Sequence, residues 1–263
     1  MAASPSFFRT WVALIALALV AGTCLSLGNW QLRRASERDA IRRSIAEGSH
    51  AAPIALTAHT PSSDLIPWRK ARADGIWLHE FTVLLDNRNF KGRPGYWVAT
   101  PLLLDASSRD AVLVLRGWLP RPILPGQSLP PLPRPEGRQA VEGQMASHVP
   151  RMFELWSRHD SPALPANLPN ADRRPPIVQN LALEDLARAT GLQLIPVVLE
   201  ETPADGKPSA SPPFIQEWPL PPIDSDQNRG YALQWFGFAA IAGIAFVTVA
   251  WKAWRRRGPP APR

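Results

Sequence analysis

Residues 231–251, YALQWFGFAAIAGIAFVTVAW, form a long apolar run close to the C-terminus. A helix rises about 1.5 Å per residue, so about 20 residues cross the roughly 30 Å hydrocarbon core of a bilayer. Trp235 and Trp251 lie near the ends of the run, as aromatic residues do at membrane interfaces. Lys252 and Arg255–Arg257 follow directly, and a buried core helix rarely stops at such a cluster. The stretch predicts a transmembrane helix.

A second apolar segment, Trp11–Gly28, lies near the N-terminus. A cleaved signal peptide usually has a shorter apolar core and an A-x-A cleavage site, and no clear site of that kind follows this run. A lipoprotein signal would use Cys24, but Thr23 stands where a small residue is expected before the modified cysteine. The segment is therefore interpreted as an uncleaved anchor. Two such segments predict a domain tethered at both ends rather than a transport bundle.

The charges beside the two segments give opposite indications of topology. Lys252 and Arg255–Arg257 mark the C-terminus as cytoplasmic under the positive-inside rule. A group of arginines after the first segment points the other way: Arg33, Arg34, Arg38, Arg42 and Arg43. Long loops are translocated largely regardless of charge, so the C-terminal cluster decides. Both termini are predicted to be cytoplasmic, and the absence of an Arg- and Ser-rich transit segment favours the inner (plasma) membrane of a bacterium.

The chain is thus predicted to have a cytoplasmic N-terminus (1–10), a first transmembrane helix (11–28), an extracytoplasmic, periplasmic domain (29–230), a second transmembrane helix (231–251) and a basic cytoplasmic tail (252–263). The net charge is +7, but the basic residues concentrate beside the spans. Membrane lipids with anionic headgroups are therefore the expected partners, and no nucleic-acid motif is present. The only cysteine, Cys24, lies in the first span, which excludes an intrachain disulfide and a thiolate metal site.

The sequence between the spans predicts a β-rich α+β domain. Strand-like runs end in turn residues and occur at Phe81–Asp86, Tyr96–Leu104, Ala111–Trp118, Gln139–Met145 and Leu194–Glu200. Pro196 suggests that the last strand lies at a sheet edge. Leu181–Thr190 has helical spacing, and Gly191 stands where a C-terminal cap belongs.

Helix and loop signals complete the organisation of this domain. Asn29–Ala46 carries helix-forming residues that can extend the first helix out of the membrane, and Pro53 must end it. The chain contains 30 prolines, which concentrate in the stretches 120–135, 162–176 and 203–222. Proline removes a backbone donor, so these stretches are predicted to be loops.

No catalytic or metal-binding motif is visible. The histidines His50, His59, His79, His148 and His159 form no HxH, HxxH or HExxH pattern. There is no G-x-S-x-G elbow, P-loop or G-x-G-x-x-G sequence. The carboxylate pairs Glu184–Asp185 and Glu200–Glu201 are consecutive, which suits element ends better than general acid–base catalysis. The chain is predicted not to be an enzyme.

Four patches in a fixed order resemble the SURF1 family of cytochrome c oxidase assembly proteins. They are GNWQLRR at 28–34, PGYWVATPL at 94–102, VLRGWLP at 114–120 and the stretch from Asn180 to Val198, and YALQWF at 231–236 opens the second span. The resemblance covers nearly the whole chain. Each patch also has a structural interpretation. Trp30 can be an interfacial anchor, and Gly117 can mark a bulge or tight bend in a strand.

The resemblance implies a function in assembly. Proteins of this family assist maturation of the catalytic subunit of the haem–copper oxidase, respiratory-chain complex IV, and bacterial members are implicated in delivery of haem a. The implied partners are that catalytic subunit and the haem a synthesis machinery, and the implied role is that of a chaperone. The alternative is a generic membrane-tethered scaffold of a cell-envelope complex without a cofactor.

The resemblance also indicates a cofactor-binding face at the start of the second span. In several members a histidine stands three residues before the position of Tyr231, but this chain has Asn228 there. Asparagine is a poor haem ligand, so the resemblance leaves three alternatives: haem a is held by another group, its binding is transient, or the chain only escorts the catalytic subunit. Asn228, Tyr231 and Trp235 follow helical spacing, and Arg229 is placed to neutralise a propionate. These four residues are the predicted cofactor-binding residues, with an ordinary interfacial belt as the alternative.

Overall fold

The computed structural model describes residues 5–122, 127–152, 163–171, 174–203, 214–221 and 223–255. It divides into two compact units. The helical unit contains Met1–Arg43 and Pro221–Arg263, and the sheet unit contains Ser44–Leu220. Arg256, Arg257, His159 and most of the predicted loop at 203–222 lie outside the described residues.

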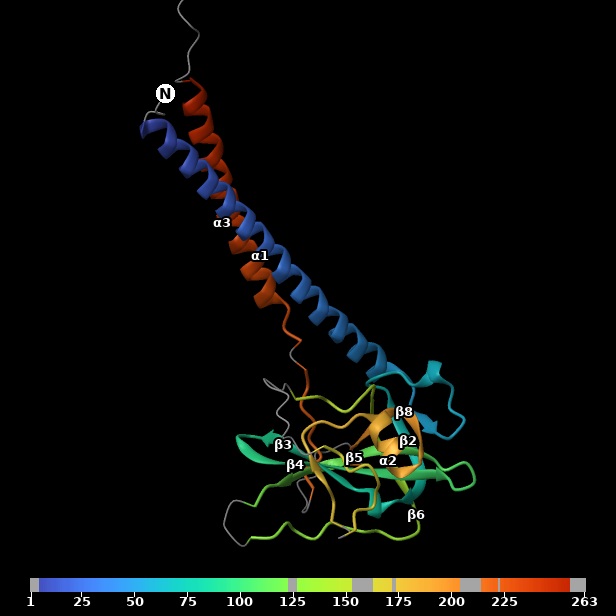
Figure 1. Ribbon diagram of the computed structural model, residues 1–263. Helices are drawn as coiled ribbons and strands as arrows, with labels where there is room; N and C mark the ends of the chain where they lie inside the picture. The colour runs from blue at the N-terminus through green and yellow to red at the C-terminus, as the bar shows by residue number, and fades with distance from the viewer. Residues whose placement is uncertain are drawn as a thin grey trace, which may run out of the picture. The chain divides into compact units, whose positions relative to one another are not determined.

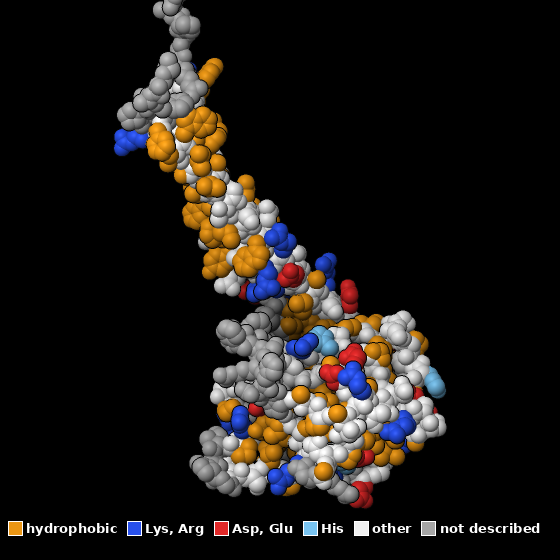
Figure 2. All heavy atoms as spheres, in the orientation of Figure 1, with side chains coloured by type: hydrophobic (Ala, Val, Ile, Leu, Met, Phe, Trp, Pro, Cys, Tyr) orange, Lys and Arg blue, Asp and Glu red, His pale blue; other side chains and the backbone are white. Residues whose placement is uncertain are grey.

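The helical unit is a pair of long helices, α1 (Pro5–His50) and α3 (Asp226–Arg255), which run side by side (Figure 1). Both are long and apolar enough to cross a membrane. Only 11% and 17% of their most apolar stretches are buried, which argues against core helices of a soluble protein. Figure 2 shows apolar side chains gathered along these helices. The predicted extension of the first helix beyond Gly28 is confirmed, and α1 ends shortly before Pro53.

Small residues allow α1 and α3 to pack closely. A Cβ added to Gly28 would lie 2.6 Å from Cε1 of Phe236, so the ring of Phe236 would have to move to admit a larger residue here. Several other small side chains of the two helices are buried as well: Cys24, Ala35, Ala232, Ala239 and Ala242. Small residues at helix contacts are typical of membrane helix pairs, because apolar lipid gives no hydrophobic drive and close packing must hold the helices together.

The sheet unit contains eight strands: β1 (Ile54–Leu56), β2 (Lys70–Trp77), β3 (Val83–Phe90), β4 (Arg93–Asp105), β5 (Asp110–Pro120), β6 (Arg138–Ala146), β7 (Ile177–Val178) and β8 (Gln193–Glu201). Their order is β1-β2-β6-β8-β5-β4-β3-β7. β1–β2, β3–β7 and β5–β8 are parallel pairs, and the other pairs are antiparallel. A further pairing of β2 with β4 closes the circuit β2-β6-β8-β5-β4 into a small barrel.

Successive side chains of each strand point to opposite faces of the sheet, so the apolar residues form two separate cores. Val112 and Val114 of β5 face the inside of the barrel, together with Ala73 and Trp77 of β2. The intervening residue Leu113 faces a second core on the outer side of the sheet. The other face of β2 is exposed, whereas β5 is buried on both faces. This explains why β2 alternates in sequence and β5 is continuously apolar.

The helix α2 (Leu183–Thr190) covers the outer core and is the only helix of more than one turn that lies wholly within the described part of the sheet unit (Figure 1). Leu186 is fully buried against the sheet. Gly191 has φ +67 and donates its N–H to the carbonyl of Ala187, so the predicted C-terminal cap is confirmed.

The structure corrects two sequence-based expectations. β8 is not an edge strand, because it pairs with β5 on one side and β6 on the other. Pro196 is tolerated because it lies in an irregularity between Leu194 and Val198, before the pairing with β6 begins. The turn expected after Asp86 is shorter than predicted. β3 continues to Phe90, and the reversal uses Lys91 and Gly92, both with positive φ.

Candidate functional site at the start of α3

Asn228 faces α1 rather than solvent. Its side-chain amide donates to Oε1 of Gln31 at 2.7 Å, which links the start of α3 to the segment of α1 that follows the first apolar run. Its other side-chain atom, Oδ1, is buried and has no hydrogen-bond partner among the described residues. A buried acceptor without a partner costs about 1–3 kcal/mol. Asn228 therefore offers a hydrogen-bond acceptor at the position where several members of the resembled family have a histidine.

Arg229 is held by two carboxylates. One guanidinium nitrogen lies 2.6 Å from Asp39 of α1, and the other lies 3.3 Å from Asp226 of its own helix. Asp39 also accepts a hydrogen bond of 2.6 Å from the hydroxyl of Ser225. Arg229 would have to exchange one of these partners to neutralise a propionate.

Two further arginines of α1 bind the backbone that leads into α3. Arg38 donates to the carbonyl of Asp224, and Arg42 donates to the carbonyl of Ile223 at 2.8 Å. Asp224 in turn accepts from the N–H of Asp226 and caps α3. Sequence reasoning did not identify Asp39, Arg38 or Arg42 as contacts, because their partners lie about 180 residues further along the chain and no local spacing indicates them.

The two aromatic residues differ in their surroundings. Tyr231 is 46% exposed, whereas Trp235 is half-buried and makes an edge contact with Phe238, with ring centroids 6.1 Å apart. The four predicted residues therefore lie on one end of α3 but do not converge. Asn228 and Arg229 point to partners on α1, and Tyr231 is left to face the surroundings of the helix.

The arrangement does not supply a haem-iron ligand at position 228. Haem iron takes imidazole, thiolate, thioether or phenolate ligands, and Asn228 is an amide already bonded to Gln31. What the start of α3 offers is an aromatic surface at Tyr231 and Trp235, with Arg229 held by Asp39 of α1 on another side of the helix. Such a surface can contact a planar, anionic amphiphile without coordinating a metal.

In the sheet unit, the motif Arg116-Gly117-Trp118 forms a β-bulge. Val98 pairs with Gly117 while Ala99 pairs with Leu115, which leaves Arg116 as the extra residue. Gly117 has φ +139, and a Cβ there would lie 2.9 Å from that of Phe214. The predicted bulge is confirmed.

The bulge places the side chain of Arg116 against the rings of Trp77 and Phe214. Its guanidinium lies 4.6 Å from the ring centroid of Trp77 and 5.0 Å from that of Phe214. It also donates to the carbonyl of Pro133 at 3.1 Å. Arg116 therefore links the segments at Pro133 and Phe214 to Trp77 of β2.

Trp118 joins the second and third sequence patches. Its indole lies where a Cβ on Gly95 would stand, at 2.4 Å from Nε1, and this explains the glycine that opens the β4 patch. The indole N–H donates to the carbonyl of Arg88 at 2.8 Å. Arg88 is itself buried, with its guanidinium 4.5 Å from the ring centroid of Trp97. Burial lowers the pKa of Arg88 to about 10, so it stays charged at neutral pH.

The segment Phe214–Trp218, which we call the strap, precedes α3 and lies on the sheet. Ile215 exchanges two backbone hydrogen bonds with Trp118, of 2.8 and 2.9 Å. Trp218 donates its indole N–H to the carbonyl of Glu201 at 2.8 Å. Burial raises the pKa of Glu200 and Glu201 to about 7, while the charge of Arg116 acts in the opposite direction on Glu201. The poorly solvated carboxyl group of Glu201 thus lies beside the strap, whereas that of Glu200 points to the other face of β8.

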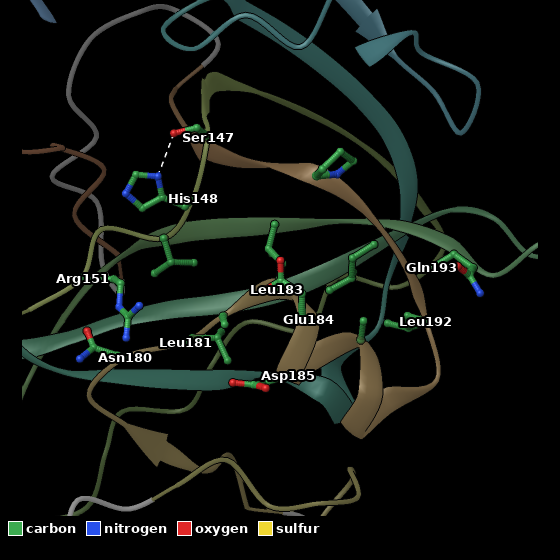
Figure 3. Close-up of a pocket in the computed structure, with 15 residues that line it drawn as sticks. Ser147, His148, Arg151, Asn180, Leu181, Leu183, Glu184, Asp185, Leu192 and Gln193 are labelled. Carbon is green, nitrogen blue, oxygen red and sulfur yellow. Dashed lines mark hydrogen bonds between the residues drawn. The ribbon is translucent and has the colours of Figure 1, made fainter. Parts of the chain in front are cut away.

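The sheet unit also has a cavity of about 600 Å³ between α2 and the segment after β6 (Figure 3). Its floor is apolar, with Val149 and Leu181, and its rim carries Arg151, Glu184 and Asp185. Both signs of charge are present, and none of the four predicted cofactor-binding residues lines it. Nearby, Asn180 holds the backbone N–H and carbonyl of Met152, at 2.8 and 3.1 Å.

The histidines of the described segments serve structural contacts or face solvent. His79 stacks on Trp77, and its Nε2 donates to the carbonyl of Pro135 at 3.1 Å. Burial lowers the pKa of His79. Within the described part of the chain, no group of three or more His, Cys, Asp or Glu could hold a metal ion.

The chain is thus a mixed-sheet domain that lies in sequence between two helices long and apolar enough to cross a membrane. The model of the SURF1 family matches residues 18–240. The chain belongs to the SURF1 family. It is 26% identical over 271 residues to uncharacterized SURF1-like proteins of Mycobacterium bovis and Mycobacterium tuberculosis, covering 96% of this chain and 89% of each relative. It is also 28% identical over 149 residues to a SURF1-like protein of Drosophila melanogaster, covering 51% of this chain and 48% of that relative.

Proposed function

We propose that the chain is an assembly factor of the haem–copper cytochrome c oxidase, and that it assists the delivery of haem a to the catalytic subunit. The observation that carries the proposal is the family match over residues 18–240, because the SURF1 family is a family of oxidase assembly factors. The structural use of Arg116, Gly95 and Trp118 supports a role through contact rather than catalysis. The proposed partners are the catalytic subunit, the haem a synthesis machinery and membrane lipids.

Deletion of the gene tests this proposal. We expect lower cytochrome c oxidase activity and lower haem a content in the membranes, measured from reduced-minus-oxidised spectra, with unchanged transcripts of the oxidase subunits. A plasmid copy should restore both. Normal oxidase and haem a in a deletion strain that lacks any paralogue would contradict the function.

The proposed site of contact with haem a is the start of α3, at Tyr231, Trp235 and Arg229. We propose no iron ligation by Asn228, because its amide is bonded to Gln31 and is a poor ligand for iron. A transient contact would use the aromatic surface for the macrocycle and Arg229 for a propionate. The ion pair of Arg229 with Asp39 would then have to open.

Substitution of Asn228 provides a spectroscopic test. Asn228→His supplies an imidazole beside the aromatic surface, so we expect a sharper, red-shifted Soret band when purified protein is loaded with haem. Trp235→Ala is expected to weaken haem binding. Identical spectra and affinities for the wild type and both variants would show that this end of α3 is only a membrane anchor.

We propose further that both termini are cytoplasmic and that the sheet unit is periplasmic. Ala106, in the exposed turn between β4 and β5, is a suitable labelling position. In a Cys24→Ala background, Ala106→Cys is expected to react with an impermeant maleimide once the outer membrane is permeable. Labelling only after lysis of the inner membrane would reverse the topology.

A membrane-tethered scaffold without a cofactor is the second candidate. The engagement of Asn228 with Gln31 and of Arg229 with Asp39 favours it, because both polar residues already have protein partners. This candidate predicts copurification with envelope proteins but a normal haem a content in the deletion strain. The spectrum of the membranes therefore separates the two functions.

A further inference from the structure

A single carboxylate lies among several arginines where α1 meets the start of α3. Asp39 contacts Arg229 at 2.6 Å, and Arg42 and Arg43 lie one turn further along α1. The hydrogen bond from Ser225, with the charges of Arg229, Arg42 and Arg43, lowers the pKa of Asp39. Asp39 is therefore a carboxylate anion at neutral pH.

The cations outnumber the anions in this region. Between Arg33 and Arg43, α1 has five arginines but only two acidic residues, Glu37 and Asp39. Arg38 and Arg42 each donate to one carbonyl, which satisfies hydrogen bonds but does not neutralise charge. A hollow of about 360 Å³ is lined by Ser36, Asp39, Arg42 and Arg43.

The cluster lies close to the level of lipid headgroups. Arg229 is about 3 Å along α3 from Tyr231, where the apolar run begins. The headgroup layer extends about 5–7 Å beyond the hydrocarbon on each side of a bilayer. With Tyr231 at the hydrocarbon boundary, Arg229 lies within this layer. Gly28 lies beside Phe236, about 8 Å inside that boundary, so Asp39, 11 residues further along α1, lies about 9 Å outside it. The arginines of α1 therefore lie at the outer edge of the headgroup layer, where their long side chains can reach back to lipid phosphates.

We propose that Arg38, Arg42, Arg43 and Arg229, the arginine cluster, form a binding site for the phosphate of an anionic phospholipid, in which Asp39 is an internal competing anion. Guanidinium groups bind phosphate through charge-assisted hydrogen bonds, in the same way that Arg229 now binds Asp39. A lipid phosphate in the hollow would replace Asp39 as the acceptor of the hydrogen bonds from the guanidinium groups. The site does not depend on haem or on oxidase assembly.

Lipid titrations of the purified full-length protein, followed by native mass spectrometry, test the proposal. Dioleoylphosphatidylglycerol and dioleoylphosphatidylcholine have the same chains, so their affinity ratio isolates the headgroup charge. We expect a preference of about tenfold for phosphatidylglycerol. Asp39→Asn should raise the affinity for phosphatidylglycerol about fivefold, because it removes the competing charge but keeps an acceptor for Ser225.

Two matched variants keep the test independent of folding. Asp226→Asn removes another carboxylate that contacts Arg229, but this one is 80% exposed and lies outside the hollow, so we expect less than a twofold change. Arg43→Gln leaves the hydrogen bonds of Asp39 in place and should lower the affinity for phosphatidylglycerol about fivefold. Equal affinities for the two lipids, or no effect of Asp39→Asn and Arg43→Gln, would overturn the proposal. An affinity for inorganic phosphate alone as high as that for phosphatidylglycerol would assign the site to free anions and overturn its assignment to lipid.

Discussion

Replacement of Trp118 by alanine is expected to lower the free energy of unfolding of the sheet unit by about 4 kcal/mol. The side chain is 1% exposed and packs on Phe90, with ring centroids 5.4 Å apart. Its removal leaves a cavity and also leaves the buried carbonyl of Arg88 without its indole donor. Denaturant unfolding of the full chain in detergent, followed by tryptophan fluorescence, measures the loss.

Trp118→Phe separates the two contributions. It keeps most of the apolar contact but loses the hydrogen bond to the carbonyl of Arg88, so we expect a loss of about 1–3 kcal/mol. Gly95→Ala should approach the effect of the alanine variant of Trp118, because its Cβ would collide with the indole. Wild-type stability in all three variants would show that this contact does not hold the sheet unit together.

Replacement of Glu200 by glutamine is expected to stabilise the sheet unit above neutral pH. Burial raises the pKa of Glu200 from 4.5 to about 7, so the folded state holds a proton that the unfolded state releases. The contribution of Glu200 to wild-type stability therefore falls as the pH rises from about 4.5 to about 7, by up to about 3 kcal/mol. The glutamine variant lacks this loss. Thermal unfolding at pH 4.5 and pH 8 should show similar midpoints at low pH and a higher midpoint for the variant at high pH.

Glu136→Gln is the matched control, because Glu136 is exposed in the loop before β6. It should leave the pH dependence unchanged. If Glu200→Gln and the wild type had the same pH dependence, the carboxyl group of Glu200 would be better solvated than the structure indicates.

The elements that were predicted correctly are those in which the order of apolar and polar residues matches the burial of the side chains. The two apolar helices and β5, buried on both faces, appear as continuous apolar runs. The alternation of β2 was missed because its inward residues Ala71 and Ala73 are small and contribute little to an apolar pattern. Pro196 was misread because an irregularity in the pairing can hold a proline inside a sheet.

The helix that carries the predicted residues was predicted correctly, whereas their role in binding a cofactor stays a prediction. Asn228, Tyr231 and Trp235 all lie in α3 (Asp226–Arg255), as their spacing predicted. Spacing could not show that Asn228 is bonded to Gln31 or Arg229 to Asp39, because those partners lie on another helix. Contacts between distant segments depend on tertiary packing, which a single sequence does not encode locally.

The hydrogen bonds between α1 and α3 join residues that are 181 to 197 positions apart. The entropic cost of closing a loop grows only with the logarithm of its length, so this loop costs about 2 kcal/mol more than a linker of roughly 20 residues. Close contacts such as Gly28 with Phe236 can offset so small a difference. In thermodynamic terms the sheet unit is an insertion into a helical hairpin, and the stability of that hairpin depends little on the size of what it carries.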